Sequence, residues 1–463
     1  MPGKLFIVSN RVTPPTGRQA AGGLAVGVLA ALRDKGGVWF GWSGDLVADA
    51  AERKFELIER GKITYGLLDM TEAEFAGYYG GMANRTLWPL FHYRIDLTSF
   101  EHDWYRTYRE VARLFADRLL ELLGPEDNVW VQDFHLIPLG SELRGLGFTG
   151  RLGFFLHIPF PPTQLYATMP WHRELASDLC AYDAVAFQTP TDREHFADYA
   201  CRELGAQPLE EEWLRVGERT IEVHACPIGI DVKEVQGLTV SAEARRQHDT
   251  IHGTLVKRAL IVGVDRLDYS KGIPERLRGY QALLAQYPKH RRHVVLMQIS
   301  APSREDLPEY RDIRRLIERL AGHIVGRYGE ADWIPLRYLN RTHSRRTLAG
   351  YYRAARVGLV TPLRDGLNLV AEEYVAAQDP EDPGVLVLSR FAGAAFVLQD
   401  ALIVNPYDVY GVAAAIDRAL TMPLAERQER HRQQLEAIRQ NDVQAWRRRC
   451  LAALEGEVPP RAS

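Results

Sequence analysis

The chain has 463 residues, enough for roughly three domains of average size or for two large ones. Lys and Arg number 57 against 60 Asp and Glu, and the formal charge of −3 argues against a duplex-DNA-binding protein, which carries a strong basic excess. Hydrophobic residues make up 46% and charged residues 25%, which is ordinary for a soluble globular protein and excludes a disordered or collagen-like chain.

The spacing of the cysteines and the length of the apolar runs indicate in which cellular compartment the protein is expected. No two of the four cysteines form a CxxC pair, so the sequence predicts neither a zinc site nor a disulfide framework. No apolar run approaches the ~18 residues that a membrane span needs. Lys4–Ser9 is expected to form a buried strand rather than a signal peptide. We therefore expect a reduced, cytoplasmic α/β enzyme.

In the first half, short runs that are mostly apolar throughout alternate with longer amphipathic ones, as in a sheet covered on both faces. The expected strands are Leu5–Val8, Val38–Trp42, Ile63–Leu68, Val129–Gln132, Leu152–Leu156, Ala184–Gln188 and Ile221–Ala225. The expected helices are Gly23–Arg33, Trp104–Leu123, Ile137–Leu146 and Thr191–Leu204. Strand followed by helix, repeated, predicts a doubly wound parallel sheet.

The alternation breaks in a polar stretch at residues 231–256 and then restarts. The expected strands are Leu260–Val264, Val294–Ile299, Ile334–Tyr338, Val357–Val360, Val385–Leu388 and Leu402–Val404. The expected helices are Pro274–Gln286, Glu309–Gly322, Ser344–Ala354, Asn368–Ala377 and Tyr410–Leu420. A second doubly wound domain is therefore expected, followed by a helical run, Leu424 to Leu454, that packs on the body.

These elements predict an α/β protein with two Rossmann-like domains that face a cleft, residues 1–235 and 236–463, the terminal helices belonging to the second. Open α/β sheets bind ligands at the carboxyl ends of their strands. A donor on one domain and an acceptor on the other is a natural use of that arrangement, although a fold alone proves no function.

Several common motifs are missing. The chain has no GxGxxG, P-loop, HExxH or GxSxG motif. His248 and His252 are four residues apart in a polar stretch and are expected on the surface. No two aspartates stand at the Asp-x-Asp spacing with which many sugar-nucleotide enzymes hold a divalent metal. Hydride transfer, metal hydrolysis and Ser-based acyl transfer are therefore disfavoured, and no metal or cofactor is expected.

Candidate anion ligands follow the first strand. Arg11 there can form a fork on a phosphate, or it is an ordinary exposed arginine. Gly22 and Gly23 open a helix, where backbone N–H groups can approach an anion, or they form a plain tight turn.

Aromatic and polar residues follow further along the first half. The aromatic residues near turns make either a wall on which a sugar stacks or ordinary core: Trp39, Phe40, Trp42, Tyr78, Tyr79 and Trp88. Asp133 ends an apolar strand and is either a helix N-cap or an acceptor for substrate hydroxyls. Three prolines in His157–Pro162 fix a rigid loop that can aim His157 into the cleft.

In the second half, Arg266 and Lys271 bracket a glycine-containing loop after a strand, a suitable clamp for a pyrophosphate. Ion pairs with Asp265 or Asp268 are the alternative. Arg304 follows the next strand.

The string from Thr361 to Glu373 reads as strand, glycine turn and helix. Its turn amides can face an anion, and Glu373 can accept hydrogen bonds from a ribose diol. Asp365 and Glu373 then span the loop and the helix.

Together these strings resemble the trehalose-6-phosphate synthase family, retaining glycosyltransferases of the GT-B fold, over nearly the whole chain. The strings that carry the resemblance are Ser9–Arg11, His157–Pro161, Arg266–Gly272, Thr361–Ala371, Phe391–Ala395 and Asn405–Tyr407. The resemblance implies transfer of glucose from UDP-glucose to glucose 6-phosphate, giving α,α-trehalose 6-phosphate and UDP.

The resemblance also implies roles for individual positions. Acceptor binding falls to Arg11, Tyr79, Trp88, Asp133 and Arg304. Donor binding falls to Gly22, Gly23, Arg266, Lys271, His343, Asp365, Leu367, Asn368, Leu369, Val370 and Glu373. Arg266 and Lys271 would neutralise the leaving UDP, Asp133 would orient the acceptor, and His157 would contact the transferred glucose.

In the implied mechanism the acceptor hydroxyl attacks from the face that the diphosphate leaves, and the leaving phosphate takes the proton. No protein nucleophile is then required, unlike a retaining hydrolase. Catalysis would be positioning plus charge stabilisation.

Four departures from the family pattern bear on base and acceptor choice. Gln132 stands where the family often has His, Leu367 replaces a common Met, His343 aligns loosely with an aromatic residue near the uracil, and Phe396-Val397 replace polar residues.

Three alternatives stay open. A glucosylglycerol-phosphate synthase would use ADP-glucose and glycerol 3-phosphate, a pseudo-glycosyltransferase would share the fold, and a non-catalytic sugar-phosphate sensor would bind without reacting. We expect no nucleic-acid or membrane partner, and the oligomeric state, a homo-oligomer included, is open.

Overall fold

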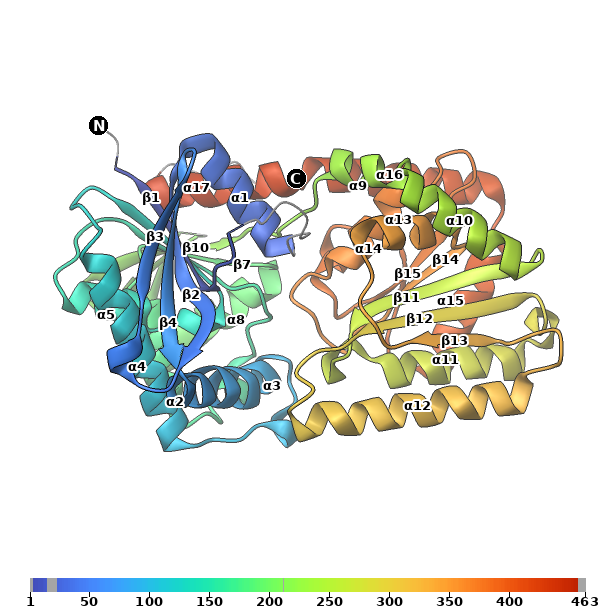
Figure 1. The fold of residues 1–463 in the computed structure, drawn as a ribbon, viewed down its shortest axis with the longest axis horizontal. Helices are drawn as coiled ribbons and strands as arrows, with labels where there is room; N and C mark the ends of the chain where they lie inside the picture. The colour runs from blue at the N-terminus through green and yellow to red at the C-terminus, as the bar shows by residue number, and fades with distance from the viewer. Residues whose placement is uncertain (1–2, 15–22, 211, 457–463) are drawn as a thin grey trace. The chain divides into compact units, whose positions relative to one another are not determined.

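The computed structural model describes residues 3–14, 23–210 and 212–456, and it divides into two compact units (Figure 1). The first unit comprises Met1–Pro227 with Gln444–Ser463, and the second comprises Ile228–Val443. This division differs from the expected boundary at 235/236 and from the expected place of the last helix. The boundary lies earlier because residues 232–255 form two helices that pack in the second unit. The last helix belongs to the first unit because its Trp446 packs on the sheet there.

The first unit is built on a ten-stranded sheet in the order β3-β4-β2-β1-β5-β6-β7-β10-β9-β8. Seven of the strands run parallel, and β3, β8 and β9 pair antiparallel at the two edges. The strands are β1 Leu5–Arg11, β2 Gly37–Val47, β3 Phe55–Arg60, β4 Ile63–Thr71, β5 Asn128–Gln132, β6 Leu152–Phe155, β7 Ala184–Phe187, β8 Gln207–Glu210, β9 Trp213–Val216 and β10 Arg219–Ala225.

All seven strands expected from apolar runs are present, and the three edge strands were not expected. The expected strands are buried almost throughout, β6 and β7 completely, as the continuous apolar runs indicate. In contrast, β8 is exposed at every position and β3 at four of its six, so neither carries an apolar run.

The helices of the first unit connect these strands along the chain. The longer ones are α1 Gly23–Lys35, α4 His102–Leu120, α5 Leu139–Gly145, α7 His172–Leu179 and α8 Pro190–Glu203. The shorter ones are α2 Glu72–Glu74, α3 Trp88–Phe91 and α6 Thr163–Tyr166. A 13-residue π-helix, η2 Phe75–Leu87, and the 3₁₀ turns η1 Ala50–Glu52, η3 Ile95–Leu97 and η4 Phe134–Leu136 complete the set.

The last helix, α17 (Val443–Glu455), packs in the first unit beside α1 (Figure 1). The Trp446 ring lies 5.1 Å from the Trp130 ring and edge-on to Phe155 at 5.4 Å. A Cβ at Gly27 of α1 would come within 2.6 Å of the Trp446 ring, so glycine permits this approach. The buried tryptophan explains why the terminal helix does not stay with the second unit.

The second unit contains a six-stranded, fully parallel sheet in the order β13-β12-β11-β14-β15-β16. All six strands expected from the sequence are found. They are β11 Ala259–Arg266, β12 Val294–Ala301, β13 Leu336–Leu339, β14 Val357–Val360, β15 Val385–Ser389 and β16 Leu402–Val404.

Helices α11 and α12 run along one side of this sheet and α10, α13 and α14 along the other (Figure 1). The main helices are α9 Val232–Thr239, α10 Ala242–Leu255, α11 Ile273–Gln286, α12 Pro308–Tyr328, α13 Arg345–Ala354, α14 Leu369–Ala377, α15 Val409–Thr421 and α16 Leu424–Gln440. The 3₁₀ turns are η5 Tyr269–Lys271, η6 Pro288–His290 and η7 Gly393–Phe396.

The polar stretch at 231–256 is therefore two helices rather than a linker. Its few apolar residues recur at helical spacing, with Val232, Val235 and Thr239 buried in α9 and Ile251 and Leu255 buried in α10. Both helices pack against α13, which places them in the second unit. The expected helical run at the C-terminus is broken at residues 441–442 into α16 and α17.

Both sheets have a topological switch point. From β1 the chain moves to β2 on one side and later to β5 on the other, and from β11 it moves to β12 and later to β14. Ligands of open α/β sheets bind outside the carboxyl ends of the strands at such points. Within the described residues, no helix is long and apolar enough to cross a membrane.

Candidate active site

Arg11 ends β1, at the switch point of the first sheet. It is exposed, and its guanidinium lies over the Trp42 ring at 5.4 Å from the ring centroid. A Cβ at Gly44, which has a φ of +102°, would approach the Arg11 Nη2 to 2.6 Å. Among the described residues Arg11 has no carboxylate partner. Its charge is therefore available to an anion.

The π-helix η2 carries Tyr78 and Tyr79 to the same edge. The buried Tyr78 hydroxyl donates to Asn10 Oδ1 at 2.9 Å, which ties η2 to the end of β1. The Tyr79 ring stacks on Phe75 at 5.0 Å and on His135 at 5.8 Å. π-Helical segments are rare and are frequently found at functional sites. The sequence indicates Tyr78 only as part of an aromatic cluster, and its link to Asn10 could not be inferred.

The tryptophans are mostly core. Trp39 is 3% exposed and its Nε1–H donates to Ser9 Oγ at 2.9 Å, and Trp42 is 7% exposed. Trp88 is 5% exposed, with its ring against His92 at 4.1 Å and Phe134 at 5.9 Å. Of the two interpretations, core packing describes Trp39 and Phe40, while Trp42 also supports Arg11.

Asp133 follows β5 with a φ of +74°. A non-glycine residue in this region is uncommon and marks a strained position, which is frequent at functional sites. Asp133 stands at the N-cap position of η4, as one of the two interpretations allowed, but its side chain makes no cap hydrogen bond there. Instead Asp133 Oδ1 accepts a hydrogen bond from the backbone N–H of His157 at 3.1 Å.

His157 lies two residues beyond β6, with its ring 4.4 Å from Phe155. Its Nε2 lies 3.0 Å from Gln132 Oε1, and its Nδ1 lies 3.4 Å from Gln188 Nε2. Burial lowers the pKa of His157 from its usual 6.5 to about 3, because burial penalises the charged imidazolium. The histidine is therefore neutral at physiological pH. Gly22 lies outside the described residues, and Gly23 begins α1.

In the second unit Lys271 ends the loop after β11, at the switch point of that sheet. Its Nζ lies 2.5 Å from Asp365 Oδ2, and the Asn368 side-chain amide donates to the same oxygen at 3.0 Å. The expected alternative of an ion pair is thus partly right, but the partner is Asp365 rather than Asp265 or Asp268. Arg266 ends β11 and is exposed.

The backbone at position 272, a glycine next to Lys271, can be adopted only by a residue without a side chain. It has a φ of +63°, and a Cβ there would lie 2.4 Å from the carbonyl oxygen of Thr361. The loop after β11 and the loop after β14 therefore touch at this glycine. The contact fixes Lys271 and Asp365 on one surface.

Asp268 and Arg304 form a second polar cluster beside the loop. Tyr310 donates to Asp268 Oδ2 at 3.0 Å, and Arg304 Nη1 lies 3.5 Å from the same oxygen and 2.5 Å from the Tyr310 hydroxyl. Arg304 follows β12 with a φ of +48°. It belongs to the second unit, whereas the other expected acceptor residues belong to the first.

Arg276 supports the second switch point, and sequence reasoning missed it. It is completely buried on α11 and pairs with the buried carboxylate of Asp265. It also donates to Thr361 Oγ1 and Gln298 Oε1, both at 3.0 Å, and to the Lys271 carbonyl at 3.3 Å. One side chain thus joins the ends of β11, β12 and β14. No local signal marks it, since it stands in an ordinary amphipathic helix.

The turn after β14 is held by the string that follows β15. The Asp365 N–H donates to the Phe391 carbonyl at 3.1 Å, and the Ala394 N–H donates to the Leu367 carbonyl at 2.8 Å. Asn368 precedes α14 with a φ of +82° and makes no side-chain cap. The first amides of a helix have no acceptor within the helix, so those of Leu369 and Val370 can meet an anion.

The two glutamates of α14 face different surroundings. Glu373 Oε1 lies 3.8 Å from Arg345 Nη2, and burial raises the pKa of its carboxyl. Glu372 is 1% exposed and its Oε2 has no partner among the described residues. Burial raises the pKa of Glu372 to about 8. No sequence signal distinguishes Glu372, because a glutamate in the first turn of a helix is ordinary.

His343 follows β13, at the edge of the second sheet, with its ring edge-on to Tyr351 at 5.6 Å. Burial and the nearby Arg341 lower the pKa of its imidazole. Phe396, one of the departures from the family pattern, is 48% exposed. Within the described residues no group of three or more His, Cys, Asp or Glu side chains is placed to hold a metal ion.

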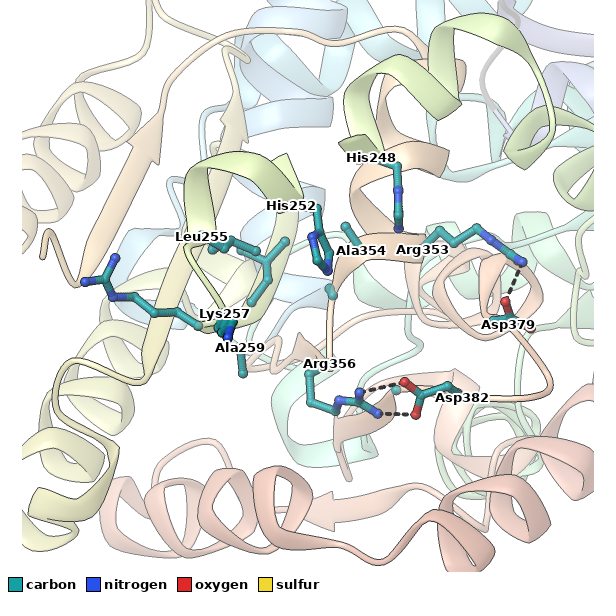
Figure 2. A pocket seen from close by; sticks show the side chains of 14 residues that line it. His248, His252, Leu255, Lys257, Ala259, Arg353, Ala354, Arg356, Asp379 and Asp382 are labelled. Atoms are coloured by element: carbon teal, nitrogen blue, oxygen red, sulfur yellow. Dashed lines mark hydrogen bonds and ion pairs between the residues drawn. The ribbon is translucent and has the colours of Figure 1, made fainter. Parts of the chain in front are cut away.

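A pocket of about 360 Å³ lies at the opposite, amino edge of the second sheet (Figure 2). Ala259, which starts β11, and Gly384, just before β15, line it together with His248 and His252. Figure 2 shows Arg353 turned to Asp379 and Arg356 turned to Asp382, and both aspartates belong to the loop before β15. The pocket is therefore separate from the predicted donor residues, and His248 and His252 lie at its rim.

Comparison with known proteins identifies the family. The model of glycosyltransferase family 20 matches residues 9–456. The trehalose-6-phosphate synthase of Enterobacter sp. (strain 638) is 44% identical over 458 residues, covering 99% of this chain and 96% of that protein.

Two solved structures are similar along their whole length. An α,α-trehalose-phosphate synthase (UDP-forming) from Burkholderia xenovorans in complex with glucose-6-phosphate has a TM-score of 0.94 and 46% identity, covering 98% of this chain and 100% of that chain. A structure from E. coli bound with UDP-2-fluoro glucose has a TM-score of 0.94 and 44% identity, covering 99% and 100%. The chain belongs to glycosyltransferase family 20.

Proposed function

We propose that this chain transfers glucose from UDP-glucose to glucose 6-phosphate with retention of configuration, forming α,α-trehalose 6-phosphate and UDP. The observation that carries the proposal is the pair of similar structures, one with glucose-6-phosphate and one with a UDP-glucose analogue, at 46% and 44% identity over almost the whole chain. The polar switch point of each unit supports it independently.

The first unit supplies the proposed acceptor residues except Arg304, which belongs to the second unit. Arg11, which has no carboxylate partner among the described residues, would fork onto the sugar phosphate. Tyr79 would add a hydroxyl, Trp88 a packing face, and Asp133 an acceptor for sugar hydroxyls. The strained backbone of Asp133, with its φ of +74°, supports a role that requires one fixed carboxylate direction. Arg304 would add a second charge to the acceptor phosphate.

The second unit supplies the donor residues. Lys271 and Arg266 would neutralise the diphosphate as it leaves, and the amides of Leu369 and Val370 would meet its oxygens. Asp365 and Asn368 would contact the donor glucose, and Glu373 the ribose. Asp365 is already engaged by Lys271 and Asn368, which suits a positioning role better than that of a nucleophile.

The leaving phosphate would accept the proton of the attacking hydroxyl. His157 would contact the transferred glucose and stay neutral, because its pKa is lowered to about 3. No metal is needed for charge neutralisation when two cationic side chains and helix amides face the diphosphate. A cytoplasmic location is supported by the free state of all four cysteines.

A panel of donors and acceptors with nucleotide release as the readout tests the proposal. We expect UDP release from UDP-glucose only when glucose 6-phosphate is present, and a phosphorylated α,α-linked disaccharide as product. Activity with ADP-glucose and glycerol 3-phosphate alone would establish the glucosylglycerol-phosphate alternative. Binding of both substrates without turnover would establish the sensor alternative.

A further inference from the structure

Three neighbouring strands of the first sheet end in polar side chains that meet one another. Gln132 is the last residue of β5, His157 follows β6 by two residues, and Gln188 directly follows β7. The strands are parallel neighbours, with Gln132 opposite Phe155 and Phe155 opposite Ala186. The register therefore places His157 level with Gln188 and Gln132 two residues earlier, opposite Phe155, with the histidine on the middle strand of the three.

Hydrogen bonds on both sides define the state of the histidine ring. A carboxamide oxygen can only accept and a carboxamide nitrogen can only donate. Gln132 Oε1, 3.0 Å from His157 Nε2, therefore requires a proton on Nε2. Gln188 Nε2, 3.4 Å from Nδ1, requires that Nδ1 carries none. The two contacts agree on one neutral tautomer.

The surroundings of the ring favour the same state. Phe155 lies 4.4 Å and Trp446 6.2 Å from the ring, and neither can stabilise an added charge by a hydrogen bond. The carboxylate of Asp133 bonds the backbone N–H of His157. Burial is the cause of the lowered pKa of His157, and within the described part of the chain no charged group offsets it.

Gln132 is completely buried, and its Nε2 has no partner among the described residues. An unpaired buried amide is costly, so a residue kept in this position despite that cost is expected to serve the site. Glutamine cannot exchange protons, whereas the histidine that the family often has here can. In this chain the neighbour of His157 is therefore fixed in charge at every physiological pH.

We propose that Gln132 and Gln188 are positioning residues that hold His157 as a neutral Nε2–H imidazole, so that its ring presents a fixed face to the transferred sugar and takes no part in proton transfer. The contact with the sugar rests on the proposed function, whereas the state of the ring does not. Both nitrogens are engaged by the glutamines, which leaves the ring face and its C–H groups for the ligand.

The test uses the full-length protein labelled with ¹⁵N-histidine, with the His157 signals assigned by their loss in His157→Asn. We expect a protonated Nε2 and an unprotonated Nδ1 that do not titrate between pH 5 and pH 8. The Gln132→Leu variant should show exchange between the two tautomers, and Gln132→Glu should shift the ring toward imidazolium. The exposed Gln207→Glu, in the same unit, is the matched control and should change nothing.

Kinetics supply a readout that a merely structural role would not change. Gln132→Glu should lower kcat by about 10²-fold, the scale of a small misplacement at a reacting centre, with little change in the KM for glucose 6-phosphate. Gln132→His should regain activity as the pH rises and the new imidazole becomes neutral. Gln132→Leu should give intermediate rates. Gln188→Leu repeats the test at Nδ1 if a Gln132 variant does not fold.

A His157 signal that titrates between pH 5 and pH 8 in the unchanged protein would overturn the proposal, as would a tautomer that Gln132→Leu and Gln188→Leu both leave unaltered. Failure of the proposed function looks different. In that case the unchanged protein would release no UDP from the substrate pair, while the nitrogen signals would still show the fixed tautomer.

Discussion

The carboxyl edges of the two sheets hold their side chains in contrasting ways. In the first unit, Gln132, His157 and Gln188 meet through neutral hydrogen bonds, and Arg11 has no carboxylate partner among the described residues. In the second unit the polar groups are paired charges, with Lys271 on Asp365 and the buried Arg276 on Asp265.

The difference has consequences for pH and for mutation. A neutral network does not change as exposed carboxylates titrate, and it leaves the charge of Arg11 for a ligand. A network of buried charges is rigid, but removal of one partner leaves an uncompensated charge in a poorly solvated place. The second unit should therefore be the more sensitive to loss of a single partner. The first should respond to acid through His157, whose neutral imidazole takes up a proton more readily when the chain unfolds.

The largest expected effect is at Arg276. Arg276→Met leaves Asp265 buried without its partner, and we expect a loss of about 3–5 kcal/mol in unfolding free energy. Denaturant unfolding of the full chain measures it. The double variant Arg276→Met with Asp265→Asn should recover part of the loss, because no charge is then left unpaired. A loss below about 1 kcal/mol would show that the pair does not organise the second switch point.

A substitution at Glu372 in the second unit should increase the free energy of unfolding, whereas Arg276→Met should decrease it. The folded-state pKa of Glu372, about 8, lies above the usual 4.5, so the folded state holds the proton more tightly and stability falls as the pH rises from 4.5 toward 8. Glu372→Gln keeps the shape without the charge. Relative to the unchanged chain it should gain on the order of 3 kcal/mol between pH 4.5 and pH 7. Equal stability profiles would contradict the burial of this carboxyl.

The next largest effect is expected at Arg266 and Lys271, the two cationic side chains proposed to neutralise the leaving diphosphate. Arg266→Ala and Lys271→Ala should each lower kcat/KM by about 10²-fold or more, the scale for losing a partner of transition-state charge. Steady-state UDP release is the measurement. Lys289→Ala removes an exposed lysine paired with Asp417 and is the control expected to retain full activity. Near-normal rates in both clamp variants would remove the leaving-group role.

Acid should act on the first unit through His157. Its folded-state pKa of about 3 lies below the usual 6.5, so the unfolded chain binds the proton more tightly and stability is lost as the pH falls below 6.5. By pH 5 the loss is on the order of 2 kcal/mol. His157→Asn should remove that part of the acid sensitivity, as measured by unfolding at pH 6.5 and pH 5. An unchanged slope would mean that the imidazole is not buried in its neutral form.

Strand ends made the positions of many candidate site residues predictable. Asp133, His157, Lys271, Arg304 and Asp365 all follow apolar runs, and ligands of parallel sheets bind at the carboxyl ends of the strands, so the order of residues along the chain indicates them. The central strands of both sheets were predictable for the same reason, since burial on both faces leaves a continuous apolar run.

The hydrogen-bond and ion-pair partners of these side chains could not be predicted, because they depend on packing between segments that are distant in the sequence. Arg276 meets Thr361 across 85 positions, and Gln188 meets His157 across 31. Helices α9 and α10 were missed because only a few buried residues, such as Ile251 and Leu255, carry their helical period. Nothing in the sequence around Trp446 indicates that it packs on the first sheet rather than on the second.

We expect the switch point of the first unit to bind the acceptor and that of the second to bind the donor. Calorimetric titration of the full chain with glucose 6-phosphate and with UDP, in Arg11→Ala and in Lys271→Ala, tests it most directly. We predict that Arg11→Ala weakens glucose 6-phosphate far more than UDP, matching a larger rise in the acceptor KM, and that Lys271→Ala does the reverse. Equal weakening of both ligands in each variant would contradict the assignment.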